Sequence, residues 1–256
     1  MTTSNPPALQ LYTVRDQLAV DRKGVLDQIA AFGYGAAEPF DILNDPARLA
    51  ADLAAAGLAV CSVHANPAGG QAGPVAAAAR MLGADTVIVP YLPPARFADL
   101  DGVQAVAAEL NGLAARLAGE GLRLGYHNHD HELAPLPDGT PALEALAAAL
   151  DPAVLLEVDT YWAAVAGQDV PALLGRLGER VRYLHVKDGP VTRDDPMTAI
   201  GAGRMPVAEI LAAAPAAWRV VELDRCATDM LTAVGDSLAW LAGRGLAQPV
   251  RPSSGN

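Results

Sequence analysis

Eight short apolar runs alternate with longer amphipathic stretches along nearly the whole chain. The runs are typical of buried strands and cover residues 8–14, 36–40, 58–65, 86–91, 122–129, 154–160, 181–188 and 218–224. Alanine- and leucine-rich helical patterns follow them at 21–32, 45–56, 71–83, 98–119, 141–150, 169–179, 206–214 and 229–243. Eight strand-then-helix units in about 250 residues match the size and count of a (β/α)8 barrel. The sequence therefore predicts an α/β fold, a single (β/α)8 TIM barrel.

The short connections between these segments leave no room for a second domain. We expect the barrel to span residues 1–246 and residues 247–256, which include "QPVRPSSGN", to form a disordered tail. An open doubly wound sheet is the structural alternative. That fold usually has a glycine fingerprint after its first strand, where this chain reads "YTVRDQL".

Charge and termini limit the classes of partner. The formal net charge of −11 disfavours nucleic acid. No uncharged run approaches the roughly 20 residues that span a bilayer, and "MTTSNPPALQ" lacks the order of a signal peptide. We therefore expect a cytoplasmic protein with no membrane partner, in which Cys61 and Cys226 are thiols. A homo-oligomer remains open.

The polar residues of the strands gather at the strand ends where a barrel carries its chemistry. All five histidines of the chain lie at or just past such ends, and none lies in a helical pattern. The candidates are Glu38, His64, His127, His129, Asp159, His185, Lys187, Glu222 and Asp224. Random placement would put some histidines on helices, so this distribution indicates a catalytic or metal site.

Three candidates follow consecutive strands and would converge in a barrel mouth: Asp159, His185 and Glu222. A fourth ligand could come from Glu132 or His127. One imidazole with two or three carboxylates suits Mn²⁺, Mg²⁺ or Co²⁺. Each residue also has a structural interpretation: Asp159 as a helix cap, His185 as a core histidine, and Glu222 as part of a surface ion pair.

Several motifs together resemble a known family. In order, they are "LQLYTVRD", "YHNHDHE", "EVDTYWA", "HVKD", "GAGRMPVAEIL" and "VVELDRC". They resemble the xylose isomerase-like barrels described as sugar phosphate isomerases/epimerases, near the myo-inosose dehydratase and hexulose 3-epimerase branches. The resemblance covers about residues 8–245. It implies one divalent metal held by Asp159, His185, Glu222 and an acid after the fifth strand.

The acid after the fifth strand is where the chain departs from that pattern. Its fifth strand reads "LGYHNH", without an acid, so the resemblance gives the role to Glu132, with His127 or water as alternatives. We expect Mn²⁺, with Mg²⁺, Co²⁺ or Zn²⁺ as alternatives.

The expected function is a metal-dependent isomerase or epimerase of a sugar or sugar phosphate. The reaction removes a proton beside a carbonyl and passes through an enediolate that the metal stabilises. Glu222 is the expected base. Lys187, His64 and His129 are candidates for the second proton transfer.

The expected substrate contacts are Tyr12, Glu38, His127, His129, Trp162, Lys187 and Asp224. Phe40 and Tyr161 could add to an apolar wall, and Arg15 to its rim. "GAGR" at 201–204 could hold a phosphate on backbone N–H groups, but a flexible turn before Pro206 is favoured.

Three other functions remain as alternatives. A lyase or dehydratase could act on inosose-like or 3-keto-glycoside substrates with the same site. An abasic-site endonuclease shares the barrel, but it needs more metal ligands and a basic face. A sugar-binding barrel without catalysis is the third.

Overall fold

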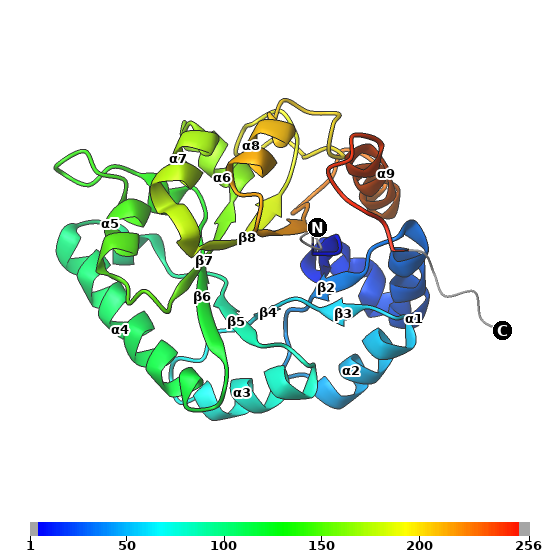
Figure 1. Cartoon of the computed structure of the whole chain (residues 1–256), viewed down its shortest axis with the longest axis horizontal. Coiled ribbons are helices and arrows are strands. Elements are labelled where there is room, and N and C mark those ends of the chain that lie inside the picture. Colours follow the sequence, from blue (N-terminus) through cyan, green and yellow to red (C-terminus); the bar gives the residue numbers. More distant parts are fainter. Residues whose placement is uncertain (1–4, 251–256) are drawn as a thin grey trace.

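Nine parallel strands form one sheet in the computed structural model, which describes residues 5–250. Their spatial order is β3-β2-β1-β9-β8-β7-β6-β5-β4. The strands are β1 (Ala8–Gln10), β2 (Ala36–Glu38), β3 (Ala59–Val60), β4 (Val63–His64), β5 (Thr86–Val89), β6 (Arg123–His127), β7 (Leu155–Asp159), β8 (Val181–Val186) and β9 (Trp218–Val221). Figure 1 shows them in the middle of the molecule, with the helices around them in chain order.

Strands β3 and β4 are two parts of the third expected strand. The backbone N–H of Cys61, between them, donates to the carbonyl of Ala37 in β2 at 3.1 Å. Past β4, the N–H of Ala65 donates to the carbonyl of Ile88 in β5 at 3.0 Å. One stretch thus joins β2 to β5 and closes the sheet, so the predicted eight-stranded barrel is confirmed.

The expected helices all form around this barrel. They are α1 (Arg15–Phe32), α2 (Pro46–Ala55), α3 (Ala72–Met81), α4 (Leu100–Ala118), α5 (Ala142–Ala149), α7 (Val170–Leu177), α8 (Val207–Ala213) and α9 (Met230–Gly243). Helix α1 begins before the expected residue 21 and is kinked at Asp21, whose φ of −144° and ψ of 80° are not helical. A short additional helix, α6 (Thr160–Val165), directly follows β7, where the sequence offered Asp159 as a helix cap.

The barrel interior changes from apolar to polar along its axis. One layer consists of Ala8, Ala36, Cys61, Ile88, Tyr183 and Val220. Side chains two residues apart on a strand share a face, so the next layer receives polar groups such as Glu38 after Ala36 and His185 after Tyr183. The apolar layer therefore forms a floor beneath a polar one.

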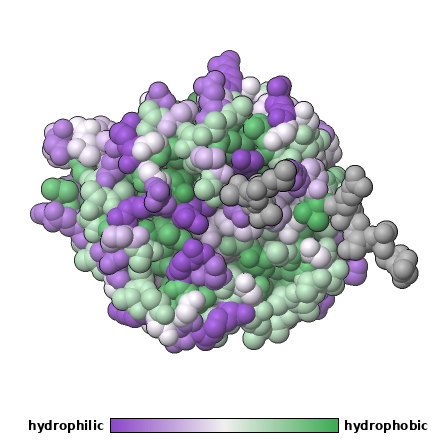
Figure 2. Space-filling model, in the orientation of Figure 1, coloured by the Kyte–Doolittle hydropathy of each residue, from purple (hydrophilic) through white to green (hydrophobic). Residues whose placement is uncertain are grey.

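Outside the strands, one large apolar cluster fills the space between the barrel and its helices. The surface in Figure 2 is a patchwork of hydrophilic and hydrophobic areas. No helix in residues 5–250 has both the length and the apolar character needed to cross a bilayer. Of the expected tail, residues 247–250 are described, and the N–H of Val250 donates to the carbonyl of Gly33 at 2.8 Å. Residues 251–256 lie outside the described part.

Asp188, just past β8, organises the loop that leads to α8. Its carboxylate is buried and accepts four backbone N–H groups, from Gly189 (2.8 Å), Gly201 (2.8 Å), Met205 (3.0 Å) and Gly203 (3.2 Å). A Cβ at Gly203 would lie 2.1 Å from Oδ1 of Asp188, which explains the glycine there. The "GAGR" stretch is therefore a turn built around a carboxylate.

Asp188→Asn should destabilise the protein by about 2–3 kcal/mol. The asparagine side chain lacks the negative charge, and its NH₂ group would face backbone N–H groups that now donate to the carboxylate. Chemical denaturation monitored by circular dichroism measures the change. Asp194→Asn is the control, since Asp194 is exposed in the same loop and should change stability by less than about 0.5 kcal/mol. Equal midpoints for the two variants would contradict the role given to Asp188.

Candidate active site

The polar layer of the barrel contains ten buried side chains from the strands and their ends. They are Gln10, Glu38, Ser62, His64, His127, Glu157, Asp159, His185, Lys187 and Glu222. Burying this many polar groups is costly unless each finds a partner. Their contacts divide them into an inner cluster around Glu157 and an outer cluster around Asp159 and Glu222.

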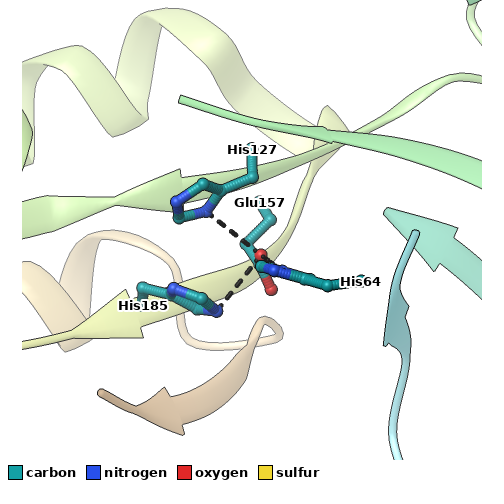
Figure 3. Close-up of side chains that lie close together, drawn as sticks. All are labelled: His64, His127, Glu157 and His185. Carbon is teal, nitrogen blue, oxygen red and sulfur yellow. Dashed lines mark hydrogen bonds and ion pairs between the residues drawn. The ribbon is translucent and has the colours of Figure 1, made fainter. Parts of the chain in front are cut away.

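Glu157 of β7 is the centre of the inner cluster, and three imidazoles converge on it (Figure 3). Its Oε2 lies 2.6 Å from Nε2 of His64, 3.1 Å from Nδ1 of His127 and 3.1 Å from Nε2 of His185. Burial raises the pKa of Glu157, but the charges of His185 and His64 outweigh that effect and hold the pKa well below its usual value. Glu157 is therefore a buried anion shared by three histidines.

Glu38 of β2 is the second carboxylate of the inner cluster. Its Oε2 accepts from Nε2 of Gln10 at 2.7 Å and lies 2.7 Å from Nε2 of His185. The hydroxyl of Ser62 donates to Oε1. Burial and the charge of Glu157 raise the pKa of Glu38. Glu38, expected as a substrate contact, is fully buried, and its carboxylate lies beside His185 and His64 in the structure.

His127 and His185 link the two clusters because each uses both ring nitrogens. His127 turns Nδ1 toward Glu157, and its Nε2 lies 3.9 Å from Oδ2 of Asp159. His185 turns Nε2 toward Glu157, and its Nδ1 lies 2.7 Å from Oε2 of Glu222. The four outer groups, His127, Asp159, His185 and Glu222, each have a ligand atom within 4.8 Å of the others.

These four residues fit a divalent metal. Two imidazole nitrogens and two carboxylate oxygens are a common donor set for such ions. Oδ2 of Asp159 is buried and makes no hydrogen bond in the described residues. Burial raises the pKa of Asp159 to about 6 despite the nearby charges of Lys187 and His185, so its anionic form is incompletely compensated. A bound cation would supply that compensation.

Asp159 also caps α6, because its Oδ1 accepts the N–H of Trp162 at 2.9 Å. The capping and ligand interpretations of this residue are compatible, since each uses a different oxygen.

Lys187 lies among three carboxylates of the outer cluster. Its Nζ is 2.7 Å from Oε2 of Glu222, 2.8 Å from Oδ2 of Asp159 and 3.0 Å from Oδ2 of Asp224; the contact with Asp159 is an ion pair without hydrogen-bond geometry. Burial lowers the pKa of Lys187, but the carboxylates outweigh it and hold the pKa well above its usual value.

Glu132 is buried, but it belongs neither to the inner cluster nor to the four candidate ligands of the outer cluster. The hydroxyl of Tyr126 donates to its Oε1 at 2.6 Å, and the N–H of His129 donates to its Oε2 at 2.8 Å. These bonds and His131 outweigh burial and lower the pKa of Glu132. The structure does not support the expected role of Glu132 as a metal ligand. Instead, it places His127, the alternative ligand, beside Asp159, His185 and Glu222.

A cavity of about 400 Å³ opens onto the outer cluster. Of the expected site residues, it is lined by Tyr12, His64, His127, His129, Lys187, Glu222 and Asp224. Phe40 adds to the wall as expected, and the sequence analysis missed Asp41, Pro90 and Tyr91. The missed residues follow β2 and β5, so their position just past strand ends was the available signal.

Two aromatic residues expected in the wall lie elsewhere. Trp162 is half-buried and does not line the cavity. Tyr161 is fully buried, and its hydroxyl accepts the N–H of Val191 at 3.1 Å, so it holds the loop after β8. Both residues belong to α6 (Thr160–Val165), so the direction of their side chains is set by this helix and not by strand β7.

Comparisons with known proteins agree with this fold. The chain is similar to a sugar phosphate isomerase/epimerase from Parabacteroides distasonis, with 23% identity, a TM-score of 0.84 and coverage of 96% of each chain. It is similar to the probable 3-DHS dehydratase AsbF from Bacillus anthracis, with 12% identity, a TM-score of 0.72 and coverage of 94% of this chain and 100% of that one. An L-ribulose 3-epimerase gives 17% identity, a TM-score of 0.65 and coverage of 94% of each chain.

At these identities the solved structures show a shared fold alone, and no curated protein matches the chain. The family model of the xylose isomerase-like TIM barrel matches residues 26–242, which is most of the sequence. The chain therefore belongs to the xylose isomerase-like TIM barrel family.

Proposed function

We propose that the protein is a divalent-metal-dependent isomerase or epimerase of a sugar that carries a carbonyl group. The observation that carries this proposal is the group of four candidate ligands, His127, Asp159, His185 and Glu222, two of which, His127 and Glu222, line a cavity with aromatic walls. When bound there, a divalent metal would polarise the carbonyl and acidify the neighbouring C–H bond. Mn²⁺ is the first ion to test, and two imidazoles make Zn²⁺ the second.

Glu222 is the proposed base. It lines the cavity, and its contacts with His185 and Lys187 are both through Oε2, which leaves Oε1 for a substrate proton. Burial raises the pKa of Glu222, but Lys187 and His185 outweigh it and hold the pKa well below its usual value. The carboxylate is thus ionised at neutral pH, and its low basicity requires a strongly acidified C–H bond.

Two histidines of the cavity are proposed for the second proton transfer. His129 is neutral at neutral pH, because burial lowers its pKa. Burial also lowers the pKa of His64, but the charges of Glu38 and Glu157 outweigh it and raise the pKa. Because their pKa values are shifted in opposite directions, His129 suits the role of proton acceptor and His64 that of proton donor.

A lyase or dehydratase is the second candidate. The ammonium of Lys187 lines the cavity and could protonate a departing oxygen after Glu222 has removed the proton. Incubating the Mn²⁺-loaded protein with a panel of keto-sugars and inosose-like substrates separates the two functions. An isomer or epimer supports the first, and release of water or an aglycone supports the second.

The ligand assignment predicts different effects for a variant at the end of β6 and one in the loop that follows it. His127→Gln should lower Mn²⁺ affinity by about 10-fold or more, whereas Glu132→Gln should leave it within about 3-fold. Glu132→Gln should instead cost about 1–3 kcal/mol of stability, because its amide faces buried donors. Titration of free Mn²⁺ by electron paramagnetic resonance measures both affinities. A 10-fold loss in Glu132→Gln would restore the assignment made from the sequence.

Glu157 is proposed as a positioning residue for both histidine ligands. Its charge lies 3.1 Å from Nδ1 of His127 and 3.1 Å from Nε2 of His185, although the hydrogen bond of that Nε2 is to Glu38. A carboxylate beside one ring nitrogen favours a proton there and leaves the other nitrogen for the metal. Glu157→Gln should therefore lower Mn²⁺ affinity about 10- to 100-fold and change the imidazole ¹⁵N shifts of the metal-free protein. Glu209→Gln, at an exposed glutamate of α8, is the control. If the imidazole ¹⁵N shifts and the Mn²⁺ affinity were both unchanged in Glu157→Gln, Glu157 would not be a positioning residue.

Glu222→Gln tests the base, because an amide cannot accept a proton at neutral pH. Solvent deuterium exchange at the carbon beside the substrate carbonyl should fall by about 10² to 10⁴, the usual worth of a positioned base. Exchange is measured by NMR at saturating Mn²⁺, so that a weaker metal site does not contribute. Exchange near the wild-type rate would move the role of base to His64, His129 or Lys187.

A further inference from the structure

A phosphate on the substrate would need donors at the mouth of the barrel. Proteins hold phosphate groups with free backbone N–H groups, often in glycine-rich turns, or with arginine and lysine side chains. Features of this kind after the strand ends include the glycine turn at 201–203, the ammonium of Lys187 and the guanidinium of Arg15.

The glycine turn has no free backbone N–H group that could bind a phosphate. All five backbone N–H groups of residues 201–205 donate within the protein. Three of them bond to the carboxylate of Asp188, and the other two bond to the carbonyls of Ala199 (3.0 Å) and Gly189 (2.9 Å). A carboxylate of this chain therefore occupies the position that a phosphate would take.

The two cationic side chains are also engaged. Lys187 is the one lysine or arginine among the described residues that line the cavity, and three carboxylates lie within 3.0 Å of its Nζ. Arg15 lies just outside the cavity. Its guanidinium donates to the carbonyls of Tyr12 (2.8 Å) and Asp224 (3.1 Å) and stacks on the ring of Tyr12 at 4.2 Å.

The cavity wall itself is acidic and aromatic. Asp41, Glu222 and Asp224 contribute three carboxylates to it, and these would repel a phosphate dianion. Tyr12 packs edge-on against Phe40 with ring centroids 5.3 Å apart, and Tyr91 lies in another part of the wall. Tyr12 and Tyr91 are 42% and 49% exposed, so their rings are available to a ligand. Aromatic faces suit the C–H faces of an uncharged sugar ring.

We propose that the cavity takes an uncharged keto-sugar, without a phosphate group, whose ring contacts Tyr12 and Tyr91. This inference rests on the proposed function for the carbonyl group and adds the charge of the substrate. A cavity of about 400 Å³ lies at the small end of ligand pockets, which suits a single sugar ring.

Matched pairs of sugars test the proposal on the Mn²⁺-loaded protein. The pairs are D-fructose with D-fructose 6-phosphate and D-ribulose with D-ribulose 5-phosphate, and inorganic phosphate is the control for competition with the metal. Binding is measured by saturation-transfer NMR, and solvent deuterium exchange is measured in the same samples. Each free sugar should bind about 10-fold more tightly than its phosphate ester, a difference of about 1.4 kcal/mol.

The two readouts separate this proposal from the proposed function. Tighter binding of the free sugars without exchange would support the uncharged substrate and count against isomerase chemistry. Exchange with the phosphate esters at higher kcat/KM than with the free sugars would overturn the uncharged substrate and leave the isomerase chemistry in place. Binding of neither member of a pair at millimolar concentration would overturn both.

A variant pair tests the aromatic contact. Tyr91→Ala should weaken binding of the free sugars about 5- to 10-fold, the usual worth of an aromatic contact. Leu100→Ala is the matched control, because Leu100 is similarly exposed at 48% but does not line the cavity. Wild-type binding in Tyr91→Ala would overturn the proposed placement of the ring.

Discussion

The site depends on one buried negative charge, the carboxylate of Glu157 inside the barrel. Three imidazoles from β4, β6 and β8 lie within 3.1 Å of its Oε2, so strands that are distant in the sequence meet at a single atom. An uncompensated charge at this depth would be very costly, so these contacts constrain where all three histidines can lie. With their inner nitrogens beside this charge, and Nε2 of His185 also hydrogen-bonded to Glu38, His127 and His185 turn their outer nitrogens toward Asp159 and Glu222.

In the outer cluster, the ammonium of Lys187 compensates the charge of several carboxylates. Asp159, Glu222 and Asp224 surround the ammonium of Lys187, and the four-residue candidate metal site lies beside it. The resulting cavity has little free positive charge, because its lysine is engaged and the glycine turn beyond β8 holds Asp188. The proposed chemistry and the proposed uncharged substrate follow from this one balance of charges.

Much of the fold was predictable because period and length are local properties of the sequence. The strand and helix patterns predicted the eight-unit barrel, and Gly57 and Gly121, which follow helices α2 and α4, have a positive φ of 73° and 76°, as is typical of glycine after a helix end. Within the site, the sequence indicated Asp159, His185 and Glu222 but assigned Glu132 where the structure brings His127. Glu132 supplies the carboxylate that the resemblance implies, but its oxygens accept hydrogen bonds from the hydroxyl of Tyr126 and the backbone N–H of His129.

The sequence by itself determined which residues lie on the inner face of each strand and at which end the polar ones gather, since alternation along a strand is independent of its neighbours. Only the tertiary structure decided which of these side chains touch. Partners such as His64 and Glu157, 93 residues apart, meet because the barrel closes and sets the register between strands. Whether two side chains touch depends on that register and on which of their nitrogen or oxygen atoms are already bonded to other neighbours. The residue pattern of a single strand contains neither kind of information.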